Sequence, residues 1–259
     1  MFSICSLTSG SAGNSLYIKN TKASVLIDCG LSGIEIERRL NALSLNCAIE
    51  KINGIIITHE HSDHCSSAGI LARRYSIPVY IREQTLSKIF DKLTNCEIKI
   101  IEKYFNIENL EFETFSVTHD AVDPIGLIVK FCEKKIGIVT DIGFATQLVI
   151  DKLSGVDGLI IESNYDDKLL MQSDRPLNVK QRIKSRFGHL SNNDAVKLVD
   201  CIDKTNLKFI GLFHISSEHN NYELAYNTMK KYLEEKKMEY VQITACRQDI
   251  PLLLANLEN

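Results

Sequence analysis

Three imidazoles and two carboxylates fall within six consecutive residues of this chain, in the segment 59–64 with the sequence HEHSDH. The segment directly follows a short β-branched run, GIIIT, which is typical of a buried strand. Because alternate residues of an extended segment point to the same side, His59 and His61 can converge on one metal ion. Asp63 and His64 lie beyond the turn and can face a second ion. Imidazole and carboxylate ligands suit Zn, Mn or Fe, so we expect a fold that holds this strand end at a metal site.

The alternative interpretation is a solvated surface turn that is rich in histidine by chance. The chain has seven histidines among 259 residues, and three of them lie in this window. Their H-x-H-x-D-H spacing behind a strand favours a metal site over a chance cluster.

The composition is that of an ordinary globular protein. Apolar residues make up 44% and charged residues 24% of the chain, and 259 residues can bury a large core in one domain. There is no apolar stretch of about 18 residues, so we expect no membrane span. The N-terminus lacks a basic segment followed by a long apolar one, which argues against a secretion signal and for a cytoplasmic location. Eight scattered cysteines without a C-x-x-C pair are most simply reduced thiols. The formal net charge of −3 does not by itself support a nucleic-acid partner.

Apolar patterning predicts strands separated by turn signals. The expected strands are Phe2–Leu7, Ser15–Ile18, Ser24–Ile27, Gly54–Ile57, Glu111–Val117, Ile125–Phe131, Lys135–Val139, Gly158–Ile161 and Phe209–Phe213. The expected amphipathic helices are Ser32–Leu45, Asn192–Asp203 and Asn221–Lys237. A further helix should follow His64, and strands and a helix should alternate up to about Lys99. The polar stretch Tyr165–Gly188 breaks the pattern and indicates a surface excursion. We interpret residues 1–259 as a single domain with two sheets sandwiched between helices.

Further metal ligands are expected at other strand ends, because one loop cannot complete a metal site. Asp28, His119, Asp141 and His214 each follow an apolar run. Taken singly, a strand-end Asp is more often a cap or a turn residue. Together with the segment 59–64, these four positions form a strong pattern.

The candidate ligands divide between two ions. The first ion would take His59, His61, His119 and Asp141, and the second Asp63, His64, Asp141 and His214. Asp141 would bridge the two ions, which in such sites lie roughly 3.5–4 Å apart and share a hydroxide. Asp28 would fix the tautomer and ring orientation of a ligand histidine.

This pattern resembles the metallo-β-lactamase superfamily in its order over nearly the whole chain. The resemblance implies a four-layer αββα sandwich with a dinuclear site at one edge of the two sheets. It also implies hydrolysis by a metal-bound hydroxide, with two divalent ions, Zn²⁺ or Mn²⁺, as cofactors.

Two segments resemble the nuclease branch of that superfamily: 162–165, with the sequence ESNY after a strand, and 188–192, with the sequence GHLSN. The ribonucleases Z and J carry a comparable histidine in a motif at the start of a helix. The resemblance implies that His189 protonates the leaving oxygen. Ser191 or Asn192 can cap the helix that follows. The alternative is that His189 is a surface-loop residue.

A basic strip leads directly into His189. Within residues 169–188, five cations accompany a single acid, Asp174. Cationic side chains beside a hydrolytic site can follow phosphates, and we expect Arg182, Lys184 and Arg186 to contact them. The alternative is a solvated helix face.

Three further segments resemble a group of small bacterial members of the superfamily that is associated with 5′–3′ DNA exonuclease activity. They are the opening segment 9–15 (SGSAGNS), His119–Ala121 (HDA) and His214–Ser216 (HIS). About 70 residues separate Asp141 from His214, which leaves no room for the large β-CASP insertion of ribonuclease J.

The expected function is therefore that of a metal-dependent phosphodiester hydrolase, with a 5′–3′ DNA exonuclease as the first choice and DNA preferred over RNA as the partner. Asp63 would bind metal and orient the nucleophile, and His189 would donate a proton to the leaving 3′-oxygen. Alternatives are a small-molecule phosphodiesterase, a thioesterase of the same fold, or a non-catalytic regulatory protein that retains the metal site. The sequence leaves open the identity of the metal, the oligomeric state and the role of His219.

Overall fold

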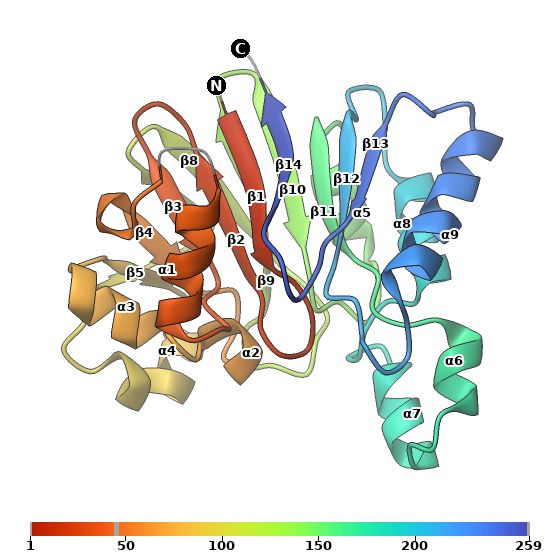
Figure 1. Ribbon diagram of the computed structural model, residues 1–259, viewed down its shortest axis with the longest axis horizontal. Coiled ribbons are helices and arrows are strands. Elements are labelled where there is room, and N and C mark those ends of the chain that lie inside the picture. Colours follow the sequence, from red (N-terminus) through yellow and green to blue (C-terminus); the bar gives the residue numbers. More distant parts are fainter. Residues whose placement is uncertain (1, 44–46, 258–259) are drawn as a thin grey trace.

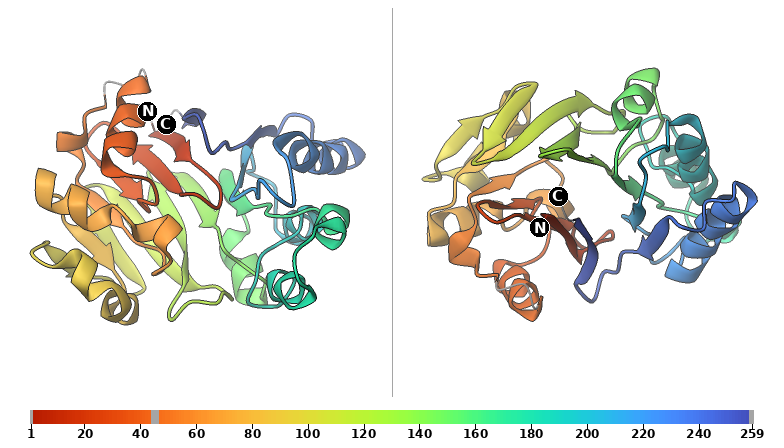
Figure 2. Two further views of the ribbon diagram at one scale, coloured as in Figure 1. Left: turned by 60° about the horizontal axis from the view of Figure 1, so that its bottom comes forward. Right: turned by 90° about the horizontal axis from the view of Figure 1, so that it is seen from above.

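Two β-sheets lie face to face and form the centre of the molecule in the computed structural model, which describes residues 2–43 and 47–257 (Figures 1 and 2). Within the described residues each sheet has seven strands. The first sheet has the spatial order β14 (Leu252–Leu257), β1 (Phe2–Thr8), β2 (Ser15–Lys19), β3 (Ser24–Ile27), β4 (Gly54–Ile56), β5 (Val79–Ile81) and β6 (Ile98–Ile100). The second has the order β13 (Gln242–Ala245), β12 (Phe209–Phe213), β11 (Gly158–Glu162), β10 (Lys134–Val139), β9 (Ile125–Phe131), β8 (Leu110–Ser116) and β7 (Tyr104–Ile107).

Helices cover the outer face of each sheet. The helices on or near the first sheet are α1 (Gly33–Ala42), α2 (Ser62–Cys65), α3 (Ala68–Tyr75) and α4 (Glu83–Ile89), with 3₁₀ turns at Ile49–Lys51 and Phe90–Leu93. Those that follow the strands of the second sheet are α5 (Gln147–Leu153), α6 (Asp167–Gln172), α7 (Leu177–Ile183), α8 (Asn192–Cys201) and α9 (Tyr222–Glu235). Among the described residues, no helix combines the length and the apolar character that crossing a membrane requires.

Three apolar clusters account for the layers. One lies between the two sheets and joins residues such as Phe2 of β1 with Phe112 of β8. A second packs α5, α8 and α9 onto the second sheet, and a third packs α1 and α3 onto the first. The order helix, sheet, sheet, helix confirms the predicted αββα sandwich (Figure 2).

Parallel pairing at the centre of each sheet positions the site. Strands β3, β4 and β5 pair in parallel, as do β10, β11 and β12. These strands are buried on both faces, which explains their continuous runs of Ile, Val and Leu. Parallel neighbours end at the same edge of a sheet, so the residues that follow them come together there.

The structure confirms the predicted strands to within one or two residues and adds three more, β7, β13 and β14. The helix expected at Ser32–Leu45 is observed as α1, and residues 44 and 45 lie outside the described part of the chain. The predicted excursion at Tyr165–Gly188 consists of α6 and α7, which project from the rest of the molecule (Figure 1). No residue of α7 is buried.

Candidate active site

Three strand-end residues of the candidate site have left-handed backbone conformations. The φ angles are 63° at Asp28, 51° at Asp141 and 53° at His214. Positive φ is uncommon outside glycine, although Asp and His tolerate it better than β-branched residues do. Such backbone strain clusters at functional sites, where the surrounding structure holds it in place. At all three positions it occurs where the chain leaves a strand and the side chain enters the cluster.

Asp28 orients two histidines from the segment 59–64. Its Oδ2 accepts the hydroxyl hydrogen bond of Thr58 at 2.7 Å and lies 2.8 Å from Nδ1 of His64. Since the only hydroxyl hydrogen of Thr58 goes to Asp28, Thr58 Oγ1 must accept from Nδ1–H of His59, 3.0 Å away. Both rings therefore carry a proton on Nδ1 and present Nε2 to the cluster. This is the tautomer that a metal ligand needs.

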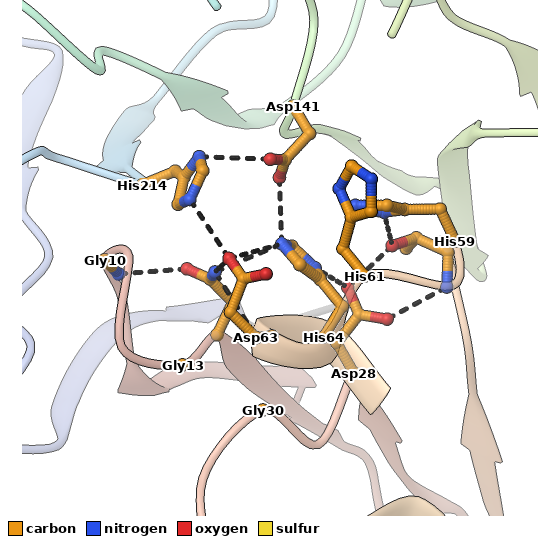
Figure 3. Close-up of polar contacts among 12 residues, drawn as sticks. Gly10, Gly13, Asp28, Gly30, His59, His61, Asp63, His64, Asp141 and His214 are labelled. Carbon is orange, nitrogen blue, oxygen red and sulfur yellow. Dashed lines mark hydrogen bonds and ion pairs between the residues drawn. The ribbon is translucent and has the colours of Figure 1, made fainter. Parts of the chain in front are cut away.

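His64 lies between carboxylates from both sheets (Figure 3). Its Nε2 is 3.0 Å from Asp141 Oδ2 and 3.5 Å from Asp63 Oδ2. Burial alone would lower the pKa of His64, but the carboxylates of Asp141 and Asp28 outweigh it and hold that pKa well above its usual value. A positive charge is thus favoured at this point, either on the ring or on an ion.

His214 occupies the corresponding position on the second sheet. Its Nε2 lies 3.4 Å from Asp63 Oδ2, and its Nδ1 lies 3.2 Å from Asp141 Oδ1. Burial opposes protonation, yet the carboxylates of Asp141, Asp63 and Glu162 raise the pKa of His214 to about 10. Asp141, conversely, has its pKa held well below the usual range by His214 and His64, against the effect of burial.

All seven predicted ligands lie in one cluster at the edge of the two sheets. Their donor atoms fall into overlapping sets within which every atom lies within 4.8 Å of the others. The sets are His59, His61 and His119; His59, His64 and Asp141; Asp63, His64 and His214; and Asp141, Glu162, His189 and His214. The chain thus brings together residues that are up to 155 positions apart, from His59 to His214.

The donor atoms fit divalent ions. Nε2 of His59 and Nε2 of His214 are buried and make no hydrogen bond, so each would leave a polar atom unsatisfied in the protein alone. His59 Nε2 carries a lone pair, because its proton is on Nδ1. Imidazole nitrogens combined with a carboxylate form a borderline ligand set that suits Zn²⁺ and Mn²⁺.

Glu162, at the end of β11, is a member of the site to which the sequence analysis gave no role. It is fully buried, and its Oε1 lies 2.7 Å from His189 Nδ1 and 2.8 Å from His214 Nδ1. Its Oε2 accepts from the backbone N–H groups of Ile142 and Leu190. The signal that could have found it is the one used for Asp28 and Asp141, a carboxylate directly after an apolar strand.

His189 lies at the entry of α8. Ser191 caps this helix by accepting from Asp194 N at 3.0 Å. The His189 side chain is 23% exposed and lines the cavity above the cluster. With Nδ1 held by Glu162, its Nε2 is the nitrogen that can meet a substrate.

The glycine-rich opening loop supports Asp63 from below. Asn14 N donates to Asp63 O at 2.8 Å, and Asn14 Nδ2 approaches Asp63 Oδ2 at 3.3 Å. A Cβ at Gly30 would lie 1.7 Å from Asp63 O, so only glycine fits at this close approach (Figure 3). The loop also reaches the second sheet, because Ser9 Oγ accepts from His214 N at 2.7 Å.

The basic strip is only partly beside the cluster. A cavity of about 450 Å³ above the cluster is lined by Arg182 and also by Arg175. Lys184 instead pairs with Asp167 at 2.7 Å, and the guanidinium of Arg186 lies 4.8 Å from the centre of the Phe144 ring. Neither of these two side chains lines the cavity.

His219, whose role the sequence left open, also lines the cavity. It is 5% exposed, and its Nε2 makes no hydrogen bond among the described residues. Burial, together with the nearby charges of Arg175 and Lys180, lowers the pKa of His219. It faces the cavity rather than bulk solvent.

Comparison with known proteins agrees with the resemblance seen in the sequence. The sequence profile of the "Metallo-beta-lactamase superfamily" matches residues 8–157. Exodeoxyribonuclease YycJ of Bacillus anthracis is 34% identical over 235 residues, which cover 89% of this chain and 88% of that protein. Exodeoxyribonuclease WalJ of Streptococcus pneumoniae is 36% identical over 236 residues, 88% of this chain and 87% of that protein. YycJ and WalJ represent the group of small members that the three segments resemble, so that prediction is confirmed.

Two more distant similarities bear on substrate and fold. Ribonuclease J of Helicobacter pylori is 30% identical over 135 residues, which cover 46% of this chain and 19% of that protein. The crystal structure of the metallo-β-lactamase fold protein YhfI of Bacillus subtilis superimposes with a TM-score of 0.74 at 15% identity, covering 97% of this chain and 99% of that one. The structural similarity shows the fold alone.

Proposed function

Because this chain belongs to the metallo-β-lactamase superfamily of hydrolases, we propose that it is a 5′–3′ DNA exonuclease that requires two divalent ions. The single observation that carries the proposal is the cluster of His, Asp and Glu donors, in which the buried Nε2 atoms of His59 and His214 make no hydrogen bond among the described residues. The names of the relatives support DNA as the substrate, and the shorter match to ribonuclease J makes RNA the alternative to be tested. We also propose a cytoplasmic location. We propose that residues 1–259 act as one domain without a β-CASP insertion.

The ligand assignment follows the sets in the cluster. His59, His61 and His119 would hold one ion, and Asp63, His64 and His214 the other. Asp141 would be the shared ligand, because its Oδ1 lies 3.7 Å from Nε2 of His119 in the first set and its Oδ2 lies 3.0 Å from Nε2 of His64 in the second. Bound divalent ions at such a site lower the pKa of a water and neutralise charge on a phosphate. We use zinc and manganese as the two candidates, because the donor set suits both.

Three residues would orient the water, supply the proton and position the proton donor. Asp63 is close enough to His64 and His214 to hold an ion with one oxygen and orient the attacking water with the other. His189 would protonate the leaving 3′-oxygen from Nε2. Glu162 keeps the ring in place through Nδ1, in the way that a carboxylate orients a catalytic histidine.

Among the predicted phosphate contacts, Arg182 is the one that the geometry favours. It lines the cavity with Arg175, and both arginines are held in exposed ion pairs, with Asp120 and Glu218 respectively. Exposed pairs of this kind are worth about 0–1 kcal/mol, so a phosphate can replace the carboxylate partner. Lys184 and Arg186 lie farther along the strip and would contact DNA only beyond the cavity.

The proposal is tested by offering metal-loaded and chelator-treated protein three substrates: a DNA oligonucleotide, an RNA oligonucleotide and a thioester. We expect cleavage of DNA that requires added Zn²⁺ or Mn²⁺, with RNA cleaved more slowly and the thioester left intact. Hydrolysis of the thioester alone would contradict the proposal and favour a thioesterase.

A further inference from the structure

An open groove leads away from the candidate active site over the surface between α4 and α7. It shares four residues with the cavity above the cluster, namely His119, Asp120, Arg182 and Phe187. From there it continues past Lys88 and Val122. Because His119 belongs to the cluster, a chain of nucleotides with its scissile phosphate at the cluster could continue into this groove.

An exposed phenylalanine stands at the junction of the cavity and the groove. Phe187 is 60% exposed, and it comes two residues before His189 in the sequence. Its backbone is nevertheless fixed, because its carbonyl accepts from Asp120 N at 3.0 Å and its N–H donates to Ser185 Oγ at 3.3 Å. A large aromatic ring on a fixed backbone beside a polar site can stack on a flat partner.

Positive side chains border the ring. Lys88 is exposed and makes no ion pair with any residue in the described ranges. Among the described residues, the side chain of Arg182 is held only by its ion pair with Asp120, and the two side chains are 72% and 54% exposed. The one other acid of the groove, Glu60, is engaged by Val122 N at 2.8 Å. Lys88 is thus available to a phosphate, and Arg182 becomes available when a phosphate replaces Asp120 as its partner.

We propose that this groove binds single-stranded nucleotides next to the scissile phosphate, with the Phe187 ring stacked on a base and with Lys88 and Arg182 on the neighbouring phosphates. An aromatic ring stacks on any base, and cations along the same groove follow the backbone. Inside a duplex both faces of a base are already covered by its neighbours. The enzyme would therefore act on single-stranded DNA or on a frayed end. The inference rests on the proposed nuclease function and adds the form of the substrate.

The test combines a protein variant with a change in the substrate. Phe187→Ala should lower kcat/KM on a single-stranded oligonucleotide by about 5- to 150-fold, the range for the loss of one stacked base. Phe187→Trp should keep the activity, because it retains an aromatic face. The matched control is Tyr240→Ala, which removes an equally exposed aromatic ring (65%) between α9 and β13.

An abasic position in the oligonucleotide shows whether the ring meets a base. Moved one nucleotide at a time along the strand, it should at one position slow the unmodified protein by the same factor as Phe187→Ala. At that position it should have no further effect on the variant, because the two changes remove the same contact. Additive losses at every position, or a Phe187→Ala variant as active as Tyr240→Ala, would overturn the inference.

The salt dependence of binding tests the proposed phosphate contact of Lys88. Lys88→Ala should reduce the slope of log affinity against log salt by about 0.7, the value for one phosphate contact with a single strand. Lys231→Ala is the control, because Lys231 is 77% exposed and lies on α9, which covers the outer face of the second sheet and does not border the groove. An unchanged slope for Lys88→Ala would contradict its role. If the unmodified protein cleaves no oligonucleotide at all, it is the nuclease proposal that fails, whereas cleavage without any effect at Phe187 refutes the groove alone.

Discussion

At the scale of single residues, the strongest evidence for metal binding is an arrangement that is incomplete without cations. His64 Nε2 faces two carboxylates, and the Nε2 atoms of His59 and His214 are buried and make no hydrogen bond among the described residues. Each unsatisfied buried polar group costs about 1–3 kcal/mol of stability. A protein keeps such a group mainly where the group has a task. Here the shared task is to hold ions.

Replacing Asp141 by alanine should abolish hydrolysis and reduce bound metal. Asp141 lies 3.7 Å from Nε2 of His119, a ligand of the first ion, and 3.0 Å from Nε2 of His64, a ligand of the second, so its loss removes a ligand from each ion. Elemental analysis of the purified variant, alongside an activity assay, checks this. A variant that keeps two ions per chain would contradict the assignment of Asp141 as the shared ligand.

Replacing His189 by alanine should have a different signature. We expect kcat to fall by about 10²- to 10⁴-fold while the metal content stays unchanged, because the ring supplies a proton and not a ligand. The activity assay and elemental analysis of the purified variant check both expectations. Metal loss in His189→Ala would show that His189 is a ligand, which its proximity to Asp141 (3.8 Å) allows geometrically.

Most residues of the candidate site can be predicted from the sequence, because the candidate metal ligands follow apolar strands. Asp28, His119, Asp141 and His214 were all found by this rule. Glu162 also ends an apolar strand, but the sequence analysis interpreted it only as part of the segment ESNY. The pairing of Lys184 with Asp167 could not be foreseen either, because the two residues come together only through the packing of α6 against α7.

At the scale of elements, the central strands were predictable, and three of the four edge strands of the two sheets, β7, β13 and β14, were not. Central strands such as β11 are continuous apolar runs. The strands β7 and β14 mix buried, half-buried and exposed positions without a continuous apolar run, and β13 has no fully buried residue. Edge strands depend on their one neighbour rather than on their own sequence, and β14 pairs with β1, some 250 residues earlier in the chain.

Helix α1 is attached to the first sheet through one buried cation. Arg39 is 6% exposed and donates through Nη1 to the carbonyls of Leu7 (2.9 Å) and Gln248 (2.8 Å). Replacing it by alanine should lower the free energy of unfolding by about 2–3 kcal/mol, because two buried carbonyls lose a charged donor.

The neighbouring Arg38 provides the control for that measurement. It pairs with the same carboxylate, Glu35, but its side chain is 62% exposed. Arg38→Ala should therefore change the free energy of unfolding by less than about 1 kcal/mol. Urea titration of both variants measures the two effects. Equal effects of the two substitutions would show that the ion pair, and not the buried carbonyl contacts, is what stabilises α1.

At the scale of the whole molecule, the candidate site joins the two sheets. His59, His61 and His64 follow β4 of the first sheet, whereas Asp141 and His214 follow β10 and β12 of the second. Ions bound at this edge would link the two halves of the sandwich. Metal binding should thus be coupled to the stability of the entire fold.

Adding Zn²⁺ or Mn²⁺ to metal-stripped protein should raise Tm. At a free metal concentration 100 times Kd the gain is about 2.7 kcal/mol, or roughly 5–10 °C for a chain of this size. Thermal unfolding followed with and without a chelator measures the shift. Asp141→Ala should show a much smaller shift, and an equal shift in that variant would place the stabilising ions elsewhere.

The decisive experiment is digestion of DNA labelled at the 5′ end or at the 3′ end by metal-stripped protein to which Zn²⁺ or Mn²⁺ is returned. A 5′–3′ exonuclease releases labelled mononucleotide at once from the 5′-labelled strand, and shortens the 3′-labelled strand step by step. We expect this pattern with added metal and none with Asp141→Ala. Cleavage at internal positions, cleavage from the 3′ end, or no cleavage with either ion would contradict the proposed function.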